Sequence, residues 1–145
     1  MKAATGAKVY GHPVEAMMRS RVEDIAKMYG ILEGMENCPE PDVFIGGGET
    51  LKFGRFSFDV LFVPGHSPGH VCFYEKAERV LLAGDTLFAG SIGRTDLPGG
   101  DSDTLLKNIR EKLLCLPDET IVMPGHGPNT TILDEKETNP FVQFF

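Results

Sequence analysis

The chain has 145 residues with a formal net charge of −7, and 41% of the residues are hydrophobic. These values are ordinary for one globular domain, which we expect to cover residues 1–145. The acidic balance argues against nucleic acid or an anionic membrane as a partner, because phosphate groups would be repelled.

The three cysteines, Cys38, Cys72 and Cys115, are odd in number and form no Cys-x-x-Cys pair. This usage favours a reducing compartment over a disulfide framework or a sulfur-rich zinc site. No run approaches the roughly 18 consecutive apolar residues of a membrane span, and the N-terminus has no long apolar signal region. We therefore expect a cytoplasmic protein without a membrane partner.

The first third of the chain predicts a short strand and then a helix. Val9 and Tyr10 precede Gly11 and Pro13, and proline is favoured in the first turn of a helix. Three- and four-residue steps predict an amphipathic helix with a Met-rich core face of Val14, Met17, Met18, Val22, Ile25, Met28, Tyr29 and Leu32. The following "IGGGETLKFG" lacks the Lys-Ser/Thr ending of a phosphate loop, so we interpret it as a turn.

A sheet is predicted from residue 56 onward. Residues 56–62 alternate between apolar and polar, which indicates a half-buried strand. Residues 70–74 and 79–83 predict two further strands joined by a polar turn, and residues 121–123 predict another. Before that last strand, an apolar stripe predicts a helix with Asp101 or Ser102 as its N-cap and Pro117 beyond its end.

Three of the predicted strands run into glycine-containing turns that carry a side chain able to bind a metal. These are His66 in "PGHSPGH", Asp85 in "AGDTLF" and His126 in "PGHGP". Neighbouring strand ends would bring two imidazoles and a carboxylate to one rim of the sheet, a donor set that suits Zn²⁺, Fe²⁺ or Mn²⁺ and leaves positions open for water and substrate. For a single histidine, local hydrogen bonding within its turn explains the pattern equally well.

The segments "VPGHSPGHVCFY", "LLAGDTLFAGSIGRTDLPGGD" and "MPGHGPNTTILDEKETNPF" resemble the later motifs of the metallo-β-lactamase superfamily, in particular its short glyoxalase II-like thioester hydrolases. The resemblance covers almost the whole chain. It implies an α/β fold, an αββα sandwich of which this chain carries the C-terminal half and the end of the first half.

The resemblance also implies roles for individual residues. His66 would bind one metal, Asp85 would bridge two metals and orient the nucleophile, and His126 would bind the second metal. His70 matches a position that supports the turn behind the metal ligands, and His12 matches no metal position, so that a surface or capping role is expected for it. Arg94 lies in the loop after Asp85, where it would meet an anionic substrate group or form an ion pair with Asp96.

One motif of the family is missing from this sequence. The first metal box, His-x-His-x-Asp-His, does not occur, and residues 1–10 resemble the stretch that follows it. The partial domain would expose a sheet edge and an apolar face, so we expect a homodimer or association through that edge. The three remaining ligands would hold one or two ions, with reduced affinity.

The resemblance implies a hydroxyacylglutathione hydrolase-like enzyme, in which a metal-bound hydroxide attacks the carbonyl carbon of a small-molecule thioester. Zinc is the expected metal, with iron or manganese as alternatives. Two other hypotheses remain open at this point. One is a mononuclear-iron enzyme like the persulfide dioxygenases, and the other is an inactive truncated remnant or interaction module.

Overall fold

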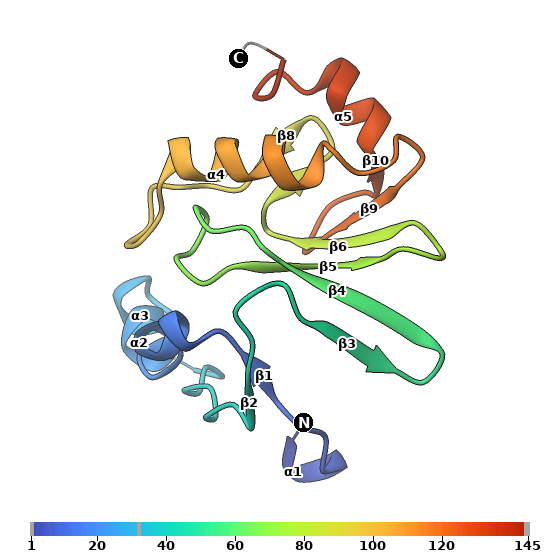
Figure 1. Cartoon of the computed structure of the whole chain (residues 1–145). Helices are drawn as coiled ribbons and strands as arrows, with labels where there is room; N and C mark the ends of the chain where they lie inside the picture. Colours follow the sequence, from blue (N-terminus) through green and yellow to red (C-terminus); the bar gives the residue numbers. More distant parts are fainter. Residues whose placement is uncertain (1, 32, 144–145) are drawn as a thin grey trace. The chain divides into compact units, whose positions relative to one another are not determined.

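The computed structural model describes residues 2–31 and 33–143, so Leu32 of the predicted helical stripe lies outside the described residues. The chain divides into two compact units, Met1–Ile45 and Gly46–Phe145 (Figure 1). The prediction of a single domain over residues 1–145 stays a prediction.

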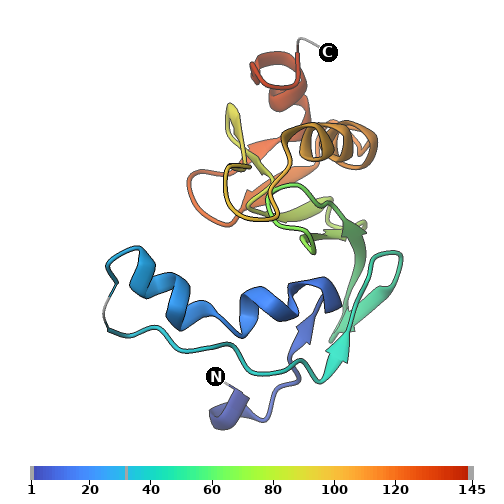
Figure 2. The same ribbon diagram turned by 90° about the vertical axis from the view of Figure 1, so that its left-hand side faces the viewer.

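The first unit is helical with one short strand pair. Its elements are α1 (Lys2–Thr5), β1 (Tyr10–Gly11), η1 (Pro13–Glu15), α2 (Ala16–Arg19), α3 (Val22–Met28) and β2 (Val43–Phe44). The two strands pair in parallel, and Figure 2 shows the helical segments following one another along the chain between them. His12 caps η1, because its Nδ1 accepts a hydrogen bond from the Val14 N–H, which fits the expected capping role.

The Met-rich stripe does not form a core, contrary to the prediction. Met17 is 62% exposed and Met28 79% exposed, and Ala26 alone is buried among the residues of α2 and α3. The expected continuous helix is broken at Arg21, whose φ of −124° and ψ of 16° are not helical. α2 therefore ends at Arg19 and α3 begins at Val22, so the stripe does not lie on the one continuous helix that was predicted.

The second unit is built on a six-stranded sheet with the order β10-β9-β6-β5-β4-β3. Its strands are β3 (Thr50–Phe53), β4 (Phe56–Phe62), β5 (Val71–Glu75), β6 (Val80–Gly84), β9 (Ile121–Pro124) and β10 (Thr130–Thr131). The four strands predicted after residue 55 are confirmed within one or two residues at each end. The turn prediction for residues 45–54 is wrong for β3, which pairs antiparallel with β4.

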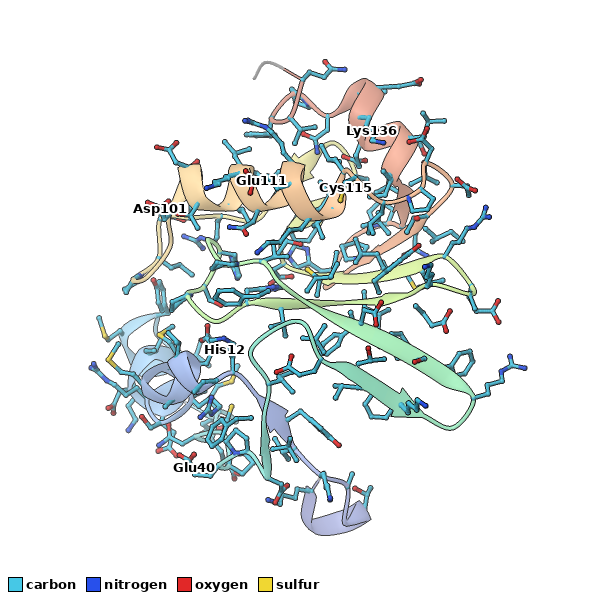
Figure 3. The ribbon with its side chains drawn as sticks, viewed as in Figure 1. His12, Glu40, Asp101, Glu111, Cys115 and Lys136 are labelled. Atoms are coloured by element: carbon cyan, nitrogen blue, oxygen red, sulfur yellow. The ribbon has the colours of Figure 1, made fainter. Side chains whose placement is uncertain are left out.

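Helices cover one face of this sheet. α4 (Ser102–Asn108) begins at the N-cap Asp101, whose carboxylate accepts a hydrogen bond from the Thr104 N–H, and continues as the π-helical η2 (Ile109–Leu113). Asp101 and Cys115 lie at opposite ends of this helical segment (Figure 3). α5 (Ile132–Thr138) follows β10. Buried side chains from the sheet and the helices form one core of Val63, Cys72, Tyr74, Leu81, Ala83, Leu87, Leu105, Ile109, Leu113, Val122, Ile132 and Val142.

The opposite face of the sheet is also apolar. Leu61 and Cys72 are paired across β4 and β5, and Cys72 belongs to the helix-covered core, so Phe56, Phe58 and the other even-numbered residues of β4 point away from it. Several large side chains on that face are partly exposed, including Phe56 (37%), Leu82 (38%) and Ile121 (40%). The predicted α/β fold class is confirmed. Within the described residues, no helix combines the length and the apolar character needed to cross a membrane.

Candidate metal site

The direction of the strands explains why the three predicted ligands meet. β4 pairs antiparallel with β5, β5 antiparallel with β6, and β6 parallel with β9, so β4, β6 and β9 all run the same way. Their C-terminal ends therefore lie at one edge of the sheet. His66 follows β4 after a three-residue turn, Asp85 directly follows β6, and His126 follows β9 after one glycine.

The Asp85 carboxylate lies between the two imidazoles. Its Oδ2 is 3.8 Å from Nε2 of His66, and its Oδ1 is 3.7 Å from Nε2 of His126. The side chain of His66 is 20% exposed, that of Asp85 38% and that of His126 75%, so the site opens to solvent on the His126 side. Each imidazole thus faces a different oxygen of one carboxylate.

The hydrogen bonding of His66 orients its ring as in a metal ligand. Its Nδ1 lies 2.9 Å from the carbonyl oxygen of Arg94. A carbonyl only accepts, so Nδ1 carries the proton and the lone pair of the neutral ring is on Nε2, which faces Asp85. Two acceptors, the Nε2 lone pair and the carboxylate, then face each other at 3.8 Å. A cation between them would satisfy both.

His70 supports this site from behind. The backbone N–H of Asp85 donates to Nε2 of His70 at 3.1 Å, so the lone pair of Nε2 is already used. The His66 and His70 rings meet edge to face, with centroids 5.9 Å apart. His70 thus contacts the backbone that carries Asp85, and its supporting role at a metal site stays a prediction.

Glycines leave room for the carboxylate and its neighbours. A Cβ on Gly125 would lie 2.3 Å from Oδ1 of Asp85, and a Cβ on Gly93 would lie 2.0 Å from the Asp85 carbonyl oxygen. A Cβ on Gly84 would lie 2.7 Å from Nε2 of His70, and Gly84 also has a positive φ of 53°. A larger residue at any of these positions would displace a member of the site.

A cleft of about 420 Å³ opens over these side chains. Its lining combines the predicted ligands with an apolar wall: His66, Asp85, Phe88, Ala89, Ser91, Ile92, Gly93, Arg94, His126, Gly127 and Pro128. Phe88 comes from the hairpin of β7 (Leu87–Phe88) and β8 (Ser91–Ile92), and its ring stacks on His126 with centroids 4.6 Å apart. This volume lies toward the lower end of the range of about 300–1,000 Å³ that is typical of small-molecule sites.

Arg94 lies at this cleft and is engaged in an ion pair. Its Nε and Nη2 donate to the two carboxylate oxygens of Asp96, each at 2.7 Å. The Arg94 guanidinium lowers the pKa of Asp96 to about 2. The structure therefore contains the loop-pinning ion pair, the second of the two roles expected from the sequence.

The metal-binding side chains form two pairs, and each pair consists of one imidazole nitrogen and one oxygen of Asp85. In the part of the chain that the structure describes, no group of three or more His, Cys, Asp and Glu side chains is arranged to hold an ion by itself. His66 with Oδ2 and His126 with Oδ1 nevertheless each offer an imidazole nitrogen and a carboxylate oxygen. Both are ligand types that zinc, iron and manganese accept.

The sequence patterns did not single out Phe88 or the spacing role of Gly93 and Gly125. Phe88 had a usable signal, since it follows the predicted bridging carboxylate by three residues in "GDTLF". Its stack on His126 needs the return of the chain through β9, almost 40 residues later, which no local pattern encodes.

Comparisons with known proteins identify the family of the chain. The family model of the metallo-beta-lactamase superfamily matches residues 1–126. A probable metallo-hydrolase, YqgX of Bacillus subtilis (strain 168), is 50% identical over 117 residues, which are 80% of this chain and 56% of that protein. The hydroxyacylglutathione hydrolase GloC of Haemophilus influenzae is 53% identical over 95 residues, which are 66% of this chain and 45% of that protein.

A solved structure is similar over nearly the whole chain. It is that of TTHA1623 in a di-iron-bound form, with a TM-score of 0.87 and 42% sequence identity, covering 97% of this chain and 67% of the other. The chain spans about half the length of the curated relatives it matches. The fold that the sequence motifs implied is thus confirmed.

Proposed function

The chain belongs to the metallo-beta-lactamase superfamily, and from this premise we propose that it acts as a metal-dependent hydrolase of small thioesters of the acyl-glutathione kind. The observation that carries the proposal is the placement of His66 and His126 against the two oxygens of Asp85 within one open cleft. The names of two relatives support it, because one is a probable metallo-hydrolase and the other a hydroxyacylglutathione hydrolase.

We propose zinc as the metal, with iron or manganese as alternatives and one or two ions per chain. His66, Asp85 and His126 would hold it. A divalent cation in such a site brings the pKa of its water toward about 7 and polarises a carbonyl oxygen. The di-iron form of TTHA1623 supports the choice of a transition metal.

Other residues of the chain orient the proposed ligands and shape the cleft. The Arg94 carbonyl holds His66 in the tautomer that presents Nε2, and His70 holds the backbone of Asp85. Phe88, Ile92 and Pro128 give the cleft an apolar wall that excludes water from one side of a bound acyl group. Arg94 stands at the rim, and release of its guanidinium from Asp96 would let it meet an anionic group of the substrate.

The setting we propose is cytoplasmic, in line with the free cysteines Cys38, Cys72 and Cys115. Glutathione, the thiol of the proposed substrates, keeps thiols reduced in that compartment. A thiol-rich compartment would also keep these side chains reduced.

Thiol release from S-lactoylglutathione by the chain loaded with Zn²⁺, Mn²⁺ or Fe²⁺ tests the proposal. We expect release that depends on the added metal and is lost in Asp85→Asn. Oxygen uptake with glutathione persulfide in the Fe²⁺-loaded chain, without thiol release, would favour the dioxygenase alternative. A folded chain that turns over neither substrate with any of the three metals would contradict the proposal and favour the remnant or interaction module.

A further inference from the structure

Glu135 of α5 is a buried carboxylate that the proposed chemistry does not use. It is 1% exposed, and Asn139, one turn later, is fully buried. Oε2 accepts hydrogen bonds from the Gly90 N–H at 3.0 Å and from Asn139 Nδ2 at 2.6 Å, and Oε1 accepts one from the Thr130 hydroxyl at 2.7 Å. Burying a carboxylate costs free energy unless hydrogen-bond donors surround it. Each of these three groups donates a hydrogen bond to Glu135.

These bonds connect Glu135 to two segments of the chain that continue from the lining of the cleft, the β7–β8 hairpin and the segment after His126. Gly90 is the second of the two turn residues between β7 and β8, with a positive φ of 68°, and it lies two residues after Phe88. Asn139 Nδ2 also donates to the Ser91 carbonyl at 3.0 Å. Thr130 lies four residues after His126, in β10. α5 therefore ties the hairpin that carries Phe88 to the chain that leaves His126.

We propose that Glu135 and Asn139 are positioning residues that hold Phe88 against His126 and so direct the His126 imidazole toward Asp85. His126 needs such support, because its side chain is 75% exposed and the Phe88 ring stacks on it at 4.6 Å. The importance of this positioning for catalysis rests on the proposed function, but the positioning itself does not.

The chemistry of the network explains why a carboxylate is required. Gly90, Thr130 and Asn139 all present hydrogens to the same group, and an ionised carboxylate has only acceptors. In Glu135→Gln, an NH₂ group of nearly the same size would face one of these donors. On the Oε2 side the bonds from Gly90 and Asn139 would be lost, and on the Oε1 side the Thr130 hydroxyl would have to turn and accept, although the helix keeps its shape.

The test compares Glu135→Gln with Glu137→Gln, an exposed position on the same helix. The main readout is the NMR shift of the His126 ring protons, which the ring current of Phe88 moves. Phe88→Leu gives the reference position without the aromatic ring. Far-ultraviolet circular dichroism and the unfolding midpoint show whether each variant remains folded.

We expect the His126 resonances of Glu135→Gln to move toward those of Phe88→Leu, while the His66 resonances and those of Glu137→Gln stay in place. Co²⁺ binding, followed by its absorption spectrum, should weaken roughly tenfold in Glu135→Gln. His126 resonances that remain at the wild-type position in a folded Glu135→Gln would overturn the proposal.

Thr130→Val covers the case in which Glu135→Gln does not fold, because valine keeps the shape and the strand propensity and removes only one donor. The same shift of the His126 resonances is expected, and its absence would overturn the proposal. The NMR readout needs neither metal nor turnover. A wild-type chain that fails to bind Co²⁺ would therefore contradict the proposed function without deciding the role of Glu135.

Discussion

Nδ1 of His66 lies 2.9 Å from the carbonyl oxygen of Arg94, so a backbone carbonyl two residues after β8 sets the tautomer of a side chain in the turn after β4. The consequence is that Nε2 presents its lone pair to Asp85 before any cation is bound. Preorganisation of this kind lowers the cost of binding, because the ligand does not have to change its proton position or its rotamer.

The space around the carboxylate gives a first prediction. Gly125→Ala should weaken Zn²⁺ binding by at least about tenfold, because a Cβ would lie 2.3 Å from Oδ1 of Asp85 and force the carboxylate away from His126. Gly46→Ala is the control, since the nearest atom to its Cβ is a Glu49 oxygen 3.8 Å away. Competition with a chromogenic chelator measures both affinities. Equal affinity in Gly125→Ala and the wild type would show that the carboxylate does not occupy this position when metal binds.

The Arg94 and Asp96 pair gives a prediction about pH. The folded-state pKa of Asp96 is lowered to about 2 from an ordinary value of 3.8, chiefly by hydrogen bonding to Arg94. The ion pair therefore adds to the free energy of unfolding above about pH 3.8, and this contribution is lost as the pH falls through about 2. In Arg94→Gln, an NMR titration of the Asp96 carboxyl carbon should have its midpoint near 3.8. A wild-type midpoint that is already near 3.8 would show that the pair does not persist in solution.

The cysteines differ in predicted reactivity. Burial raises the pKa of Cys72 to about 12, and its thiol donates to the Ala83 carbonyl, whereas Cys38 and Cys115 are exposed. Since the thiolate is the reactive form, a disulfide reagent at pH 8 should label two thiols rapidly in the folded chain and a third only after unfolding. Three equally fast thiols under native conditions would contradict the described packing of β5.

Self-association remains a prediction from the sequence. The partly exposed Phe56, Leu82 and Ile121 on the face of the sheet opposite α4 support it. We expect sedimentation velocity to show a mass above that of the 15.9 kDa chain at micromolar concentration, and Leu82→Lys to shift the distribution toward monomer. A single monomeric species throughout the micromolar range would rule out this expectation.

The sequence predicted most of the sheet, because its signals are local. The alternation at Phe56–Phe62 and the apolar runs before Asp85 and His126 place three strands, and their glycine turns mark the ends. The strand Thr50–Phe53 was missed because three glycines dominate the segment before it, although its register is fixed by pairing with β4. Asp101 was one of the two expected caps, and it makes the capping bond to Thr104.

Other features depend on distant parts of the chain. The Met-rich helix has a regular stripe, but periodicity does not reveal the break at Arg21 or the exposure of Met28. Similarly, the turn motifs indicated which residues can bind metal. They did not show that His66 and His126 face separate oxygens of Asp85, since that follows from the order of β4, β6 and β9 in the sheet.

The most direct test of the account is the metal content of the chain after reconstitution with Zn²⁺ and gel filtration, for the wild type and for Asp85→Asn, with Asp103→Asn as the matched control on the exposed first turn of α4. We predict one or two ions per chain in the wild type and in Asp103→Asn, and essentially none in Asp85→Asn. Full metal content in a folded Asp85→Asn would show that another group holds the metal, and it would contradict the assignment of His66, Asp85 and His126 as its ligands.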